Sequence, residues 1–153
     1  MIIRKGHVSD MIELQKLFTD TIREICRTDY NERQIDAWCR GVENTERWQK
    51  MLETQFVVVA EEEKVIGFCS LDHGNHIDFL FIHKDYQRKG VAHQLYDEIE
   101  KEARRLQQVA LTSDVSKTAR PFFERIGFKV KKEQEVRIRD VVLTNYKMIK
   151  SIQ

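Results

Sequence analysis

The stretch from Phe79 to Ala103, FLFIHKDYQRKGVAHQLYDEIEKEA, constrains the fold more than any other part of the chain. It begins with an apolar run of the kind that forms a buried strand. A basic loop with one glycine follows. After the loop, apolar residues recur at helical spacing, at Val91, Leu95, Ile99, Ala103 and Leu106. The pattern predicts a strand that passes through a short loop into an amphipathic helix.

The loop from Gln87 to Ala92 has the composition of an anion site. The first turn of a helix leaves backbone N–H groups unpaired and carries the positive end of the helix dipole. Such an end binds phosphate, and a glycine lets the backbone approach the ligand closely. Two cations, Arg88 and Lys89, and a small residue at Gly90 suit a pyrophosphate. The alternative is a solvated basic loop, and the hexapeptide alone does not decide between them.

The remaining segments predict a mixed sheet. Strands are expected at 1–6, 55–62, 65–71, 76–83 and 109–114, with two more within 128–150, and helices at 8–27, 31–54 (broken near Gly41), from 91 onward and at 117–128. Helices and strands alternate only in the second half. We therefore expect an α/β fold of the α+β type, with helices on both faces of a mixed sheet. With 153 residues and no linker, residues 1–153 are expected to form a single domain.

Local signals refine the helix ends. Asn31 and either Asn44 or Thr45 are expected to cap the two parts of the second helical region, and Thr118 the helix over 117–128. Gly127 is expected to end that helix in a left-handed conformation. In the first helix, Ile12 is expected to belong to the buried stripe with Leu17 or Phe18, Ile22 and Ile25.

Charge and cysteine content exclude several classes of protein. Lysine and arginine number 26 against 25 aspartates and glutamates, a net charge of +1, so no basic field draws the chain to nucleic acid or to a membrane. The basic residues between 129 and 139 alternate with acids, which indicates a solvated hairpin. The three cysteines fit no zinc motif, which predicts reduced thiols, no metal and a cytoplasmic location. No apolar run approaches the roughly 20 residues that span a bilayer, and the N-terminus lacks a signal core.

Residues 87–92 also match the [Q/R]-x-x-G-x-[G/A] element of the GNAT superfamily of N-acetyltransferases, which holds the coenzyme A pyrophosphate there. The preceding FIHKDY resembles the family's V/I-H-P-x-[Y/F] string, with Lys84 in place of proline. Downstream, SDVSKTARPFFERIGFKV resembles the S/N-x-x-A-x-x-F-[Y/F]-E-x-x-G-F segment, and IIRKGHVSDMIELQKLF resembles the opening strand and helix. The resemblance covers nearly the whole chain and is closest in type to small single-domain bacterial members.

The resemblance implies the GNAT fold, in which the fourth and fifth strands splay apart, and it implies acetyl-CoA as cosubstrate. Backbone groups of Leu80, Phe81 and Ile82 would bond the pantetheine arm. The loop from Gln87 to Val91 and Ala92 would hold the pyrophosphate. Ser116 stands where the family often has a coenzyme-binding asparagine.

Phe123 would also lie near the coenzyme, although core packing explains it equally well. Many members have a tyrosine at this position that protonates the leaving thiolate, which phenylalanine cannot do. Tyr146 on the last strand is a candidate replacement, with a surface strand tyrosine as the alternative.

The reaction needs a general base, since a protonated amine cannot attack a thioester, and the resemblance implies that this base lies on the fourth strand. His76 and Asp78 are the candidates. By alternation they share one face, opposite Ile77, Phe79 and Phe81. Asp78 could instead pair with a structural arginine, because a carboxylate in an apolar strand needs a partner.

These features predict acetyl transfer from acetyl-CoA to an amine by direct attack in a ternary complex. A non-catalytic acyl-CoA sensor or partner module on the same fold is the alternative. The acceptor, a small-molecule or peptide amine, is unassigned, with Tyr30 the residue best placed to bind it; Trp38 and Trp48 are more typical of packing. The length of the acyl chain and a homodimer through the terminal strands are both left open.

Overall fold

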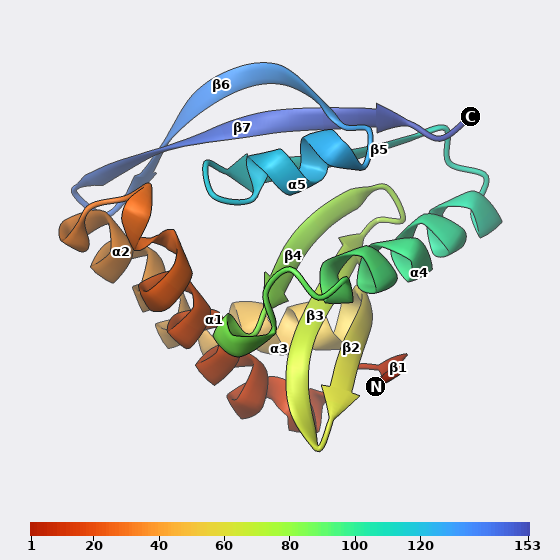
Figure 1. Ribbon diagram of the computed structural model, residues 1–153, viewed down its shortest axis with the longest axis horizontal. Helices are drawn as coiled ribbons and strands as arrows, with labels where there is room; N and C mark the ends of the chain where they lie inside the picture. Colours follow the sequence, from red (N-terminus) through yellow and green to blue (C-terminus); the bar gives the residue numbers. More distant parts are fainter.

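A seven-stranded mixed sheet forms the centre of the protein, in a computed structural model that describes residues 1–153 (Figure 1). Its strands are β1 (Ile2–Lys5), β2 (Phe56–Glu62), β3 (Lys64–Asp72), β4 (His76–Ile82), β5 (Ala110–Ser116), β6 (Lys129–Ile138) and β7 (Val141–Ser151). Their order across the sheet is β1-β2-β3-β4-β5-β7-β6. Only the β4–β5 pair is parallel, so the predicted mixed sheet is confirmed.

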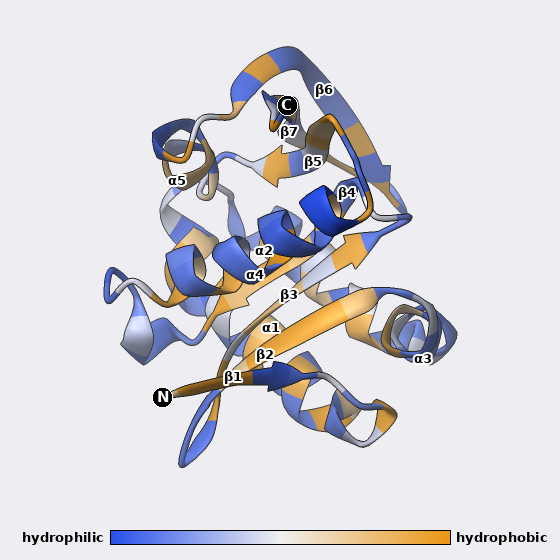
Figure 2. Ribbon diagram, turned by 90° about the vertical axis from the view of Figure 1, so that its right-hand side faces the viewer, coloured by the Kyte–Doolittle hydropathy of each residue, from blue (hydrophilic) through white to orange (hydrophobic).

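Helices cover both faces of this sheet, as predicted. The helices α1 (Met11–Ile25), α2 (Glu32–Cys39) and α3 (Thr45–Thr54) contribute to one buried apolar cluster, and α4 (Val91–Arg105) and α5 (Arg120–Arg125) to the other. The β2 strand supplies Val57 and Val59 to the first cluster and Val58 and Ala60 to the second. Because β2 is buried on both faces, its sequence is a continuous apolar run, which Figure 2 shows as an almost wholly hydrophobic strand.

The helical stripes follow the predicted spacing with two exceptions. In α4 the predicted stripe residues Val91, Leu95, Ile99 and Ala103 are buried. Leu106 is 42% exposed because the helix ends before it. In α1 the buried residues are Leu14, Leu17, Phe18, Thr21 and Ile22. The placement of Ile12 in this stripe is wrong, since it is 77% exposed on the outer side of the helix.

Three of the four predicted helix ends are confirmed. The side chains of Asn31 and Asn44 each accept a hydrogen bond from the backbone N–H three residues on, and Gly127 has a φ of +104°. The prediction for Thr118 is wrong. Its hydroxyl donates to Asp29 instead, at 2.7 Å, and α5 begins only at Arg120.

The β4 and β5 strands pair over only two positions, His76 with Thr112 and Ile77 with Ser113. By contrast, β5 pairs with β7 along its whole length, from Ala110 to Ser116. Beyond Ile77 the two strands therefore diverge and leave a gap in the middle of the sheet. This is the splayed arrangement that the sequence resemblance implies.

A β-bulge at Asp78 marks the point of divergence. Ser70 on β3 lies opposite Phe79 and the next residue lies opposite Ile77, so Asp78 is the extra residue. The predicted alternation is wrong here for a physical reason, because the bulge shifts the period. Ile77 packs in the cluster with α4, whereas Phe79 and Phe81 pack in the cluster with α1.

A polar cluster joins α4 to β7 on the other side of the gap. The Glu100 carboxylate accepts hydrogen bonds from Tyr96 (2.6 Å), Lys150 (2.9 Å) and Arg104 (3.0 Å). Burial raises the pKa of this carboxyl, but the hydrogen bonds outweigh burial and hold the pKa at about 2. Lys150 belongs to β7, so the cluster connects α4 to the half of the sheet that contains β5, β7 and β6.

We predict that this cluster stabilises the fold in a pH-dependent way. The carboxyl has a lower pKa in the folded state than its ordinary 4.5, so its stabilisation is complete above pH 4.5 and is lost as the pH falls through about 2. Glu100→Gln should lower the free energy of unfolding at pH 7 by about 1–2 kcal/mol. Urea unfolding of both proteins between pH 2 and 7 measures this, with the surface variant Glu98→Gln as control. An unchanged difference across that range would contradict the prediction.

Candidate active site

The loop between β4 and α4 presents a row of free backbone donors. Gly90 caps α4 with a φ of +81°, and Arg88 is left-handed as well, with a φ of +59°. None of the backbone N–H groups from Arg88 to His93 makes a hydrogen bond within the chain. A side-chain carbon built on Gly90 would meet nothing within 4 Å. The start of α4 is therefore open, electropositive and rich in donors, which suits a phosphate group.

The side chains of this loop have different roles. Gln87 donates to the carbonyl of Ile82 at 2.7 Å and so folds the loop back onto the end of β4. Val91 is 4% exposed and packs in the core. Arg88 and Lys89 are exposed, and the Lys89 ammonium lies 5.4 Å from the ring centre of Tyr86. The two cations are thus free to face an anion.

Backbone groups on β4 are unpaired where β5 has turned away. The N–H of His83 donates to Ile66 on β3 at 2.8 Å, so by alternation Phe81 also bonds toward β3, while Leu80 and Ile82 face the gap. The Ile82 carbonyl accepts from Thr21 and from Gln87. The N–H and C=O of Leu80 and the N–H of Ile82 have no strand beside them.

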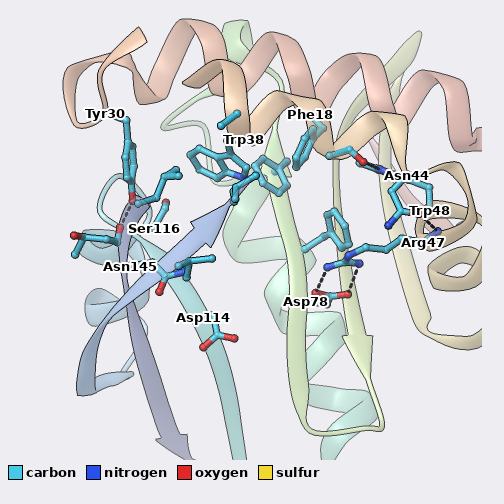
Figure 3. A pocket seen from close by; sticks show the side chains of 18 residues that line it. Phe18, Tyr30, Trp38, Asn44, Arg47, Trp48, Asp78, Asp114, Ser116 and Asn145 are labelled. Atoms are coloured by element: carbon cyan, nitrogen blue, oxygen red, sulfur yellow. Dashed lines mark hydrogen bonds and ion pairs between the residues drawn. The ribbon is translucent and has the colours of Figure 1, made fainter. Parts of the chain in front are cut away.

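A cavity of about 440 Å³ opens beside this gap (Figure 3). Helices α1, α2 and α3 form one side, β4 another, and β5, β6 and β7 the third. Its charged lining residues are Arg47, Asp78 and Asp114, and most of its other lining residues are apolar or aromatic: Phe18, Tyr30, Ala37, Trp38, Trp48, Phe79, Phe81, Val136, Ile138 and Leu143. The cavity is thus an apolar chamber with a few polar groups at the mouth of the splay.

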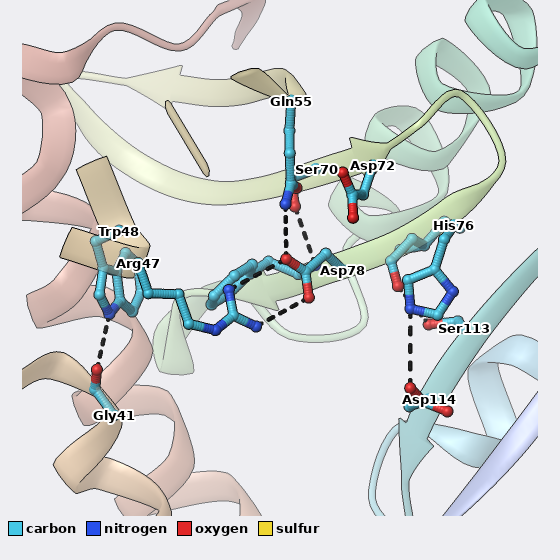
Figure 4. A network of polar contacts seen from close by, with 12 residues as sticks. Gly41, Arg47, Trp48, Gln55, Ser70, Asp72, His76, Asp78, Ser113 and Asp114 are labelled. Carbon is cyan, nitrogen blue, oxygen red and sulfur yellow. Dashed lines mark hydrogen bonds and ion pairs between the residues drawn. The ribbon is translucent and has the colours of Figure 1, made fainter. Parts of the chain in front are cut away.

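Asp78 is held by three donors (Figure 4). Arg47 donates to both carboxylate oxygens, at 3.0 and 3.2 Å, and Gln55 donates to one of them at 2.8 Å. The Arg47 guanidinium also lies 4.8 Å from the ring centre of Phe79. The sequence left open a pairing of Asp78 with a structural arginine, and the structure contains that pair. These three hydrogen bonds fill most of its acceptor positions and commit Asp78 to Arg47 and Gln55.

His76 points toward a different acid. Its Nδ1 lies 2.8 Å from the Thr112 hydroxyl, and its Nε2 lies 3.8 Å from Asp114 on β5. Figure 4 shows His76 and Asp78 directed to separate partners. Asp114 lines the cavity and accepts one hydrogen bond, from Gln134 at 2.8 Å.

Sequence analysis missed Asp114. Alternation along 110–116 places Thr112, Asp114 and Ser116 on one face, opposite the buried Leu111 and Val115. That signal identifies an acid on the exposed face of a strand. Only the sheet order shows that this face borders β4.

Tyr30 lines the cavity with its ring but not with a free hydroxyl. It is 4% exposed. The hydroxyl donates to the carbonyl of Thr144 at 2.7 Å and accepts from the N–H of Lys117 at 2.9 Å. Burial raises the pKa of Tyr30 to about 12. The residue therefore ties α2's leading loop to β7 and to the β5–α5 connection.

The other predicted site residues lie apart from the cavity or at its edge. Ser116 lines it, and its hydroxyl accepts from the N–H of Ala119 at 3.1 Å. Phe123 is 3% exposed and packs edge-on against Phe128, at 5.0 Å between ring centres. Tyr146 packs with the α4 and α5 cluster, where the Arg120 guanidinium lies 4.5 Å from its ring centre.

The cysteines offer no nucleophile in the cavity. All three are buried, and burial raises their pKa values, to about 11 for Cys26. The thiolate is therefore scarce at neutral pH. No group of three or more histidines, cysteines or acids is arranged to hold a metal ion. None of the helices has both the length and the apolar character needed to cross a membrane.

Comparison with known proteins agrees with this geometry. Residues 26–150 match the model of the acetyltransferase (GNAT) domain. The chain is 34% identical over 148 residues to the uncharacterized N-acetyltransferase YafP of Escherichia coli K12, covering 95% of this chain and 93% of that one. The chain belongs to the GNAT family, and it is therefore an enzyme of the acetyl-CoA-dependent N-acetyltransferase class.

Solved structures show the same fold. A GCN5-related N-acetyltransferase from Rhodopseudomonas palustris superposes with a TM-score of 0.95 at 30% identity, over 99% of this chain and 95% of that one. The PaiA N-acetyltransferase of Thermoplasma acidophilum, solved in complex with coenzyme A, superposes with a TM-score of 0.80 at 19% identity, over 98% of each chain.

We predict that the Tyr30 hydroxyl is structural. Tyr30→Phe leaves a backbone N–H and a backbone carbonyl without their partner, so the free energy of unfolding should fall by about 1–3 kcal/mol. Urea unfolding measures this loss. Tyr86→Phe, which removes a hydroxyl from a half-buried loop residue, is the control. A stable Tyr30→Phe protein with weakened acceptor binding would contradict the prediction and restore a direct binding role.

Proposed function

We propose that the protein transfers an acetyl group from acetyl-CoA to a primary amine by direct attack in a ternary complex. One observation carries the proposal: the free donors at the start of α4, the unpaired backbone of β4 and the apolar cavity all open on the same gap between β4 and β5. A donor and an acceptor that enter from the two sides would meet there.

The donor would lie along the gap. The backbone N–H groups from Arg88 to His93 would hold the pyrophosphate, with Arg88 and Lys89 as countercharges. Leu80 and Ile82 would bond the pantetheine amides. The Thermoplasma acidophilum structure, which shares the fold, was solved in complex with coenzyme A, and this supports coenzyme A as the ligand of such a fold.

Transfer needs a base, because an alkylamine is protonated at neutral pH. Of the two cavity carboxylates, Asp114 accepts one hydrogen bond and Asp78 accepts three. We assign proton acceptance to Asp114, with His76 behind it to take the proton onward, and a positioning role to Asp78. The neutral nitrogen then attacks the thioester carbon, the C–N bond forms, the nitrogen releases its second proton to water, and the C–S bond breaks. A backbone N–H of β4 would stabilise the carbonyl oxygen.

The leaving thiolate takes up a proton to complete the reaction. Phe123 is buried and has no proton to give. Tyr146 packs on the α5 side of the gap, away from the cavity, and is the proposed donor. A thiol pKa near 8.5 makes the thiolate a tolerable leaving group, so water can substitute for a missing acid. A non-catalytic acyl-CoA sensor is the second candidate function, and Phe123 is the observation that favours it.

We predict that Gly90→Glu abolishes acetyl-CoA binding. The new carboxylate would project into the space where the pyrophosphate is expected, and its charge would repel the phosphates. Calorimetry should show at least about 100-fold weaker binding. Circular dichroism should show a retained fold. Ser151→Glu introduces the same charge on an exposed strand end and should bind normally. Equal affinities for the two variants would overturn the assignment of the loop.

We predict that Asp114 and Asp78 differ in their effect on the pH profile. Asp114→Asn should lower kcat by about 100-fold and remove the rise of kcat/KM with pH, and His76→Ala should shift that rise. Asp78→Asn should lower activity less than Asp114→Asn does, and it should leave the shape of the pH profile of kcat/KM unchanged. The surface variant Asp20→Asn is the control. If only Asp78→Asn alters the profile, the base is Asp78. Normal acetyl-CoA binding without turnover on any amine would favour the sensor.

A further inference from the structure

The charges that line the cavity leave one carboxylate without a cation. Arg47 is committed to Asp78 through two hydrogen bonds and to the ring of Phe79. Asp114, by contrast, is 45% exposed in its side chain and has no lysine or arginine within ion-pair distance. Lys147 lies opposite it on β7 but forms no ion pair with it. A substrate cation would find its countercharge at Asp114, whereas Lys147 is not among the residues that line the cavity and the lining cation Arg47 is already paired, so the lining offers no free cation to a substrate carboxylate.

An unsatisfied acceptor lies on the same wall. The Oδ1 atom of Asn145 is buried and has no hydrogen-bond partner. Asn145 lies opposite Ser116, two residues along β5 from Asp114, so the two side chains share a face. Buried polar atoms are seldom left unpaired, and a donor on a bound molecule would satisfy this one. Asp114 and Asn145 together therefore suit a group with several N–H donors, as an ammonium has.

The opposite side of the cavity is aromatic. Trp38 and Phe81 are only half-buried, and their ring centres lie 6.3 Å apart. Phe18 packs against Phe81 at 4.8 Å, which fixes the ring. Rings held in this way bind a flat or bulky apolar group. An unbranched polyamine would leave this surface unused.

The β6–β7 hairpin closes the cavity at the α2 end. Arg33 on α2 pairs with Asp140 in the hairpin turn at 2.6 Å. Gln34 donates to the carbonyl of Val142 at 3.0 Å, and Tyr30 donates to β7 as described above. Figure 1 shows the hairpin reaching α2. A polypeptide cannot run through the cavity past these contacts, and about 440 Å³ is a volume for a small molecule.

From these observations we infer that the acceptor is a small primary amine with an aromatic or bulky apolar body and no carboxylate. Its ammonium lies at Asp114 and Asn145, and its body packs on Trp38 and Phe81. The inference rests on the proposed acetyl transfer, but it also makes a claim about binding that does not require turnover.

Intrinsic fluorescence tests that claim directly. The chain has two tryptophans, Trp38 and Trp48, and both line the cavity. With coenzyme A present, phenylethylamine should change the emission saturably. Phenylalanine, which adds only a carboxylate, and spermidine, which lacks a ring, should bind at least about tenfold more weakly. With acetyl-CoA, kcat/KM should follow the same order, with product mass as confirmation.

Variants separate the two halves of the inference. Asp114→Asn should weaken binding of phenylethylamine by about tenfold and leave binding of the uncharged phenylethanol unchanged. Trp38→Leu should weaken both ligands, as measured by calorimetry. Asp20→Asn, on the surface of α1, should weaken neither.

Each outcome decides one of the two proposals. Preference for phenylalanine or spermidine with acetyl transfer intact would overturn the acceptor class alone. Binding of phenylethylamine without acetylation would support the acceptor site and overturn the proposed reaction. The absence of any fluorescence change or turnover with phenylethylamine would overturn the inference.

Discussion

The loss of pairing between β4 and β5 is the constraint on which the rest of the structure depends. The two strands share hydrogen bonds at only two positions, and the bulge at Asp78 falls directly after the second. A continuous sheet would satisfy the backbone of Leu80 and would fill the space that the cavity occupies. The sheet accepts unpaired backbone groups in its interior, which cost free energy unless a ligand satisfies them. The polar backbone of β4 is therefore best explained as the binding surface for an extended ligand with amide groups.

The ion pair of Arg47 with Asp78 fixes one wall of this gap. A bulge residue has no ladder partner, so its side chain is free to take a direction that the strand alternation does not allow. Here that side chain meets α3 and a guanidinium that also covers Phe79. The pair removes two charges from the cavity and orients the helix against β4. Asp114, on the opposite wall, has no lysine or arginine beside it. Two carboxylates at the same level of the sheet thus have different surroundings.

The hairpin of β6 and β7 closes the α2 end of the cavity, on the side that carries Asp114. Its contacts with α2 come from residues far apart in the sequence, such as Arg33 and Asp140, and these exposed pairs are individually weak. The buried hydroxyl of Tyr30 is the stronger connection, because it bridges two backbone segments at once. The shape of the cavity at this end is thus set by a few tertiary contacts between the hairpin and the region of α2.

The sequence by itself determined most of the local structure and the glycine-containing loop before α4. Periodicity and turn residues are local, so they predicted the strands, most helix caps, the mixed sheet and the glycine-capped start of α4, and the motifs predicted the family. The tertiary structure decided which side chains surround the cavity. The bulge at Asp78 broke the alternation that had grouped His76 with Asp78, and Thr118 bonded across to Asp29 instead of capping α5. Asp114 and Arg47 became site residues only because sheet order and helix packing brought β5 and α3 to the gap. Such pairings join residues tens of positions apart, and local patterns carry no information about them.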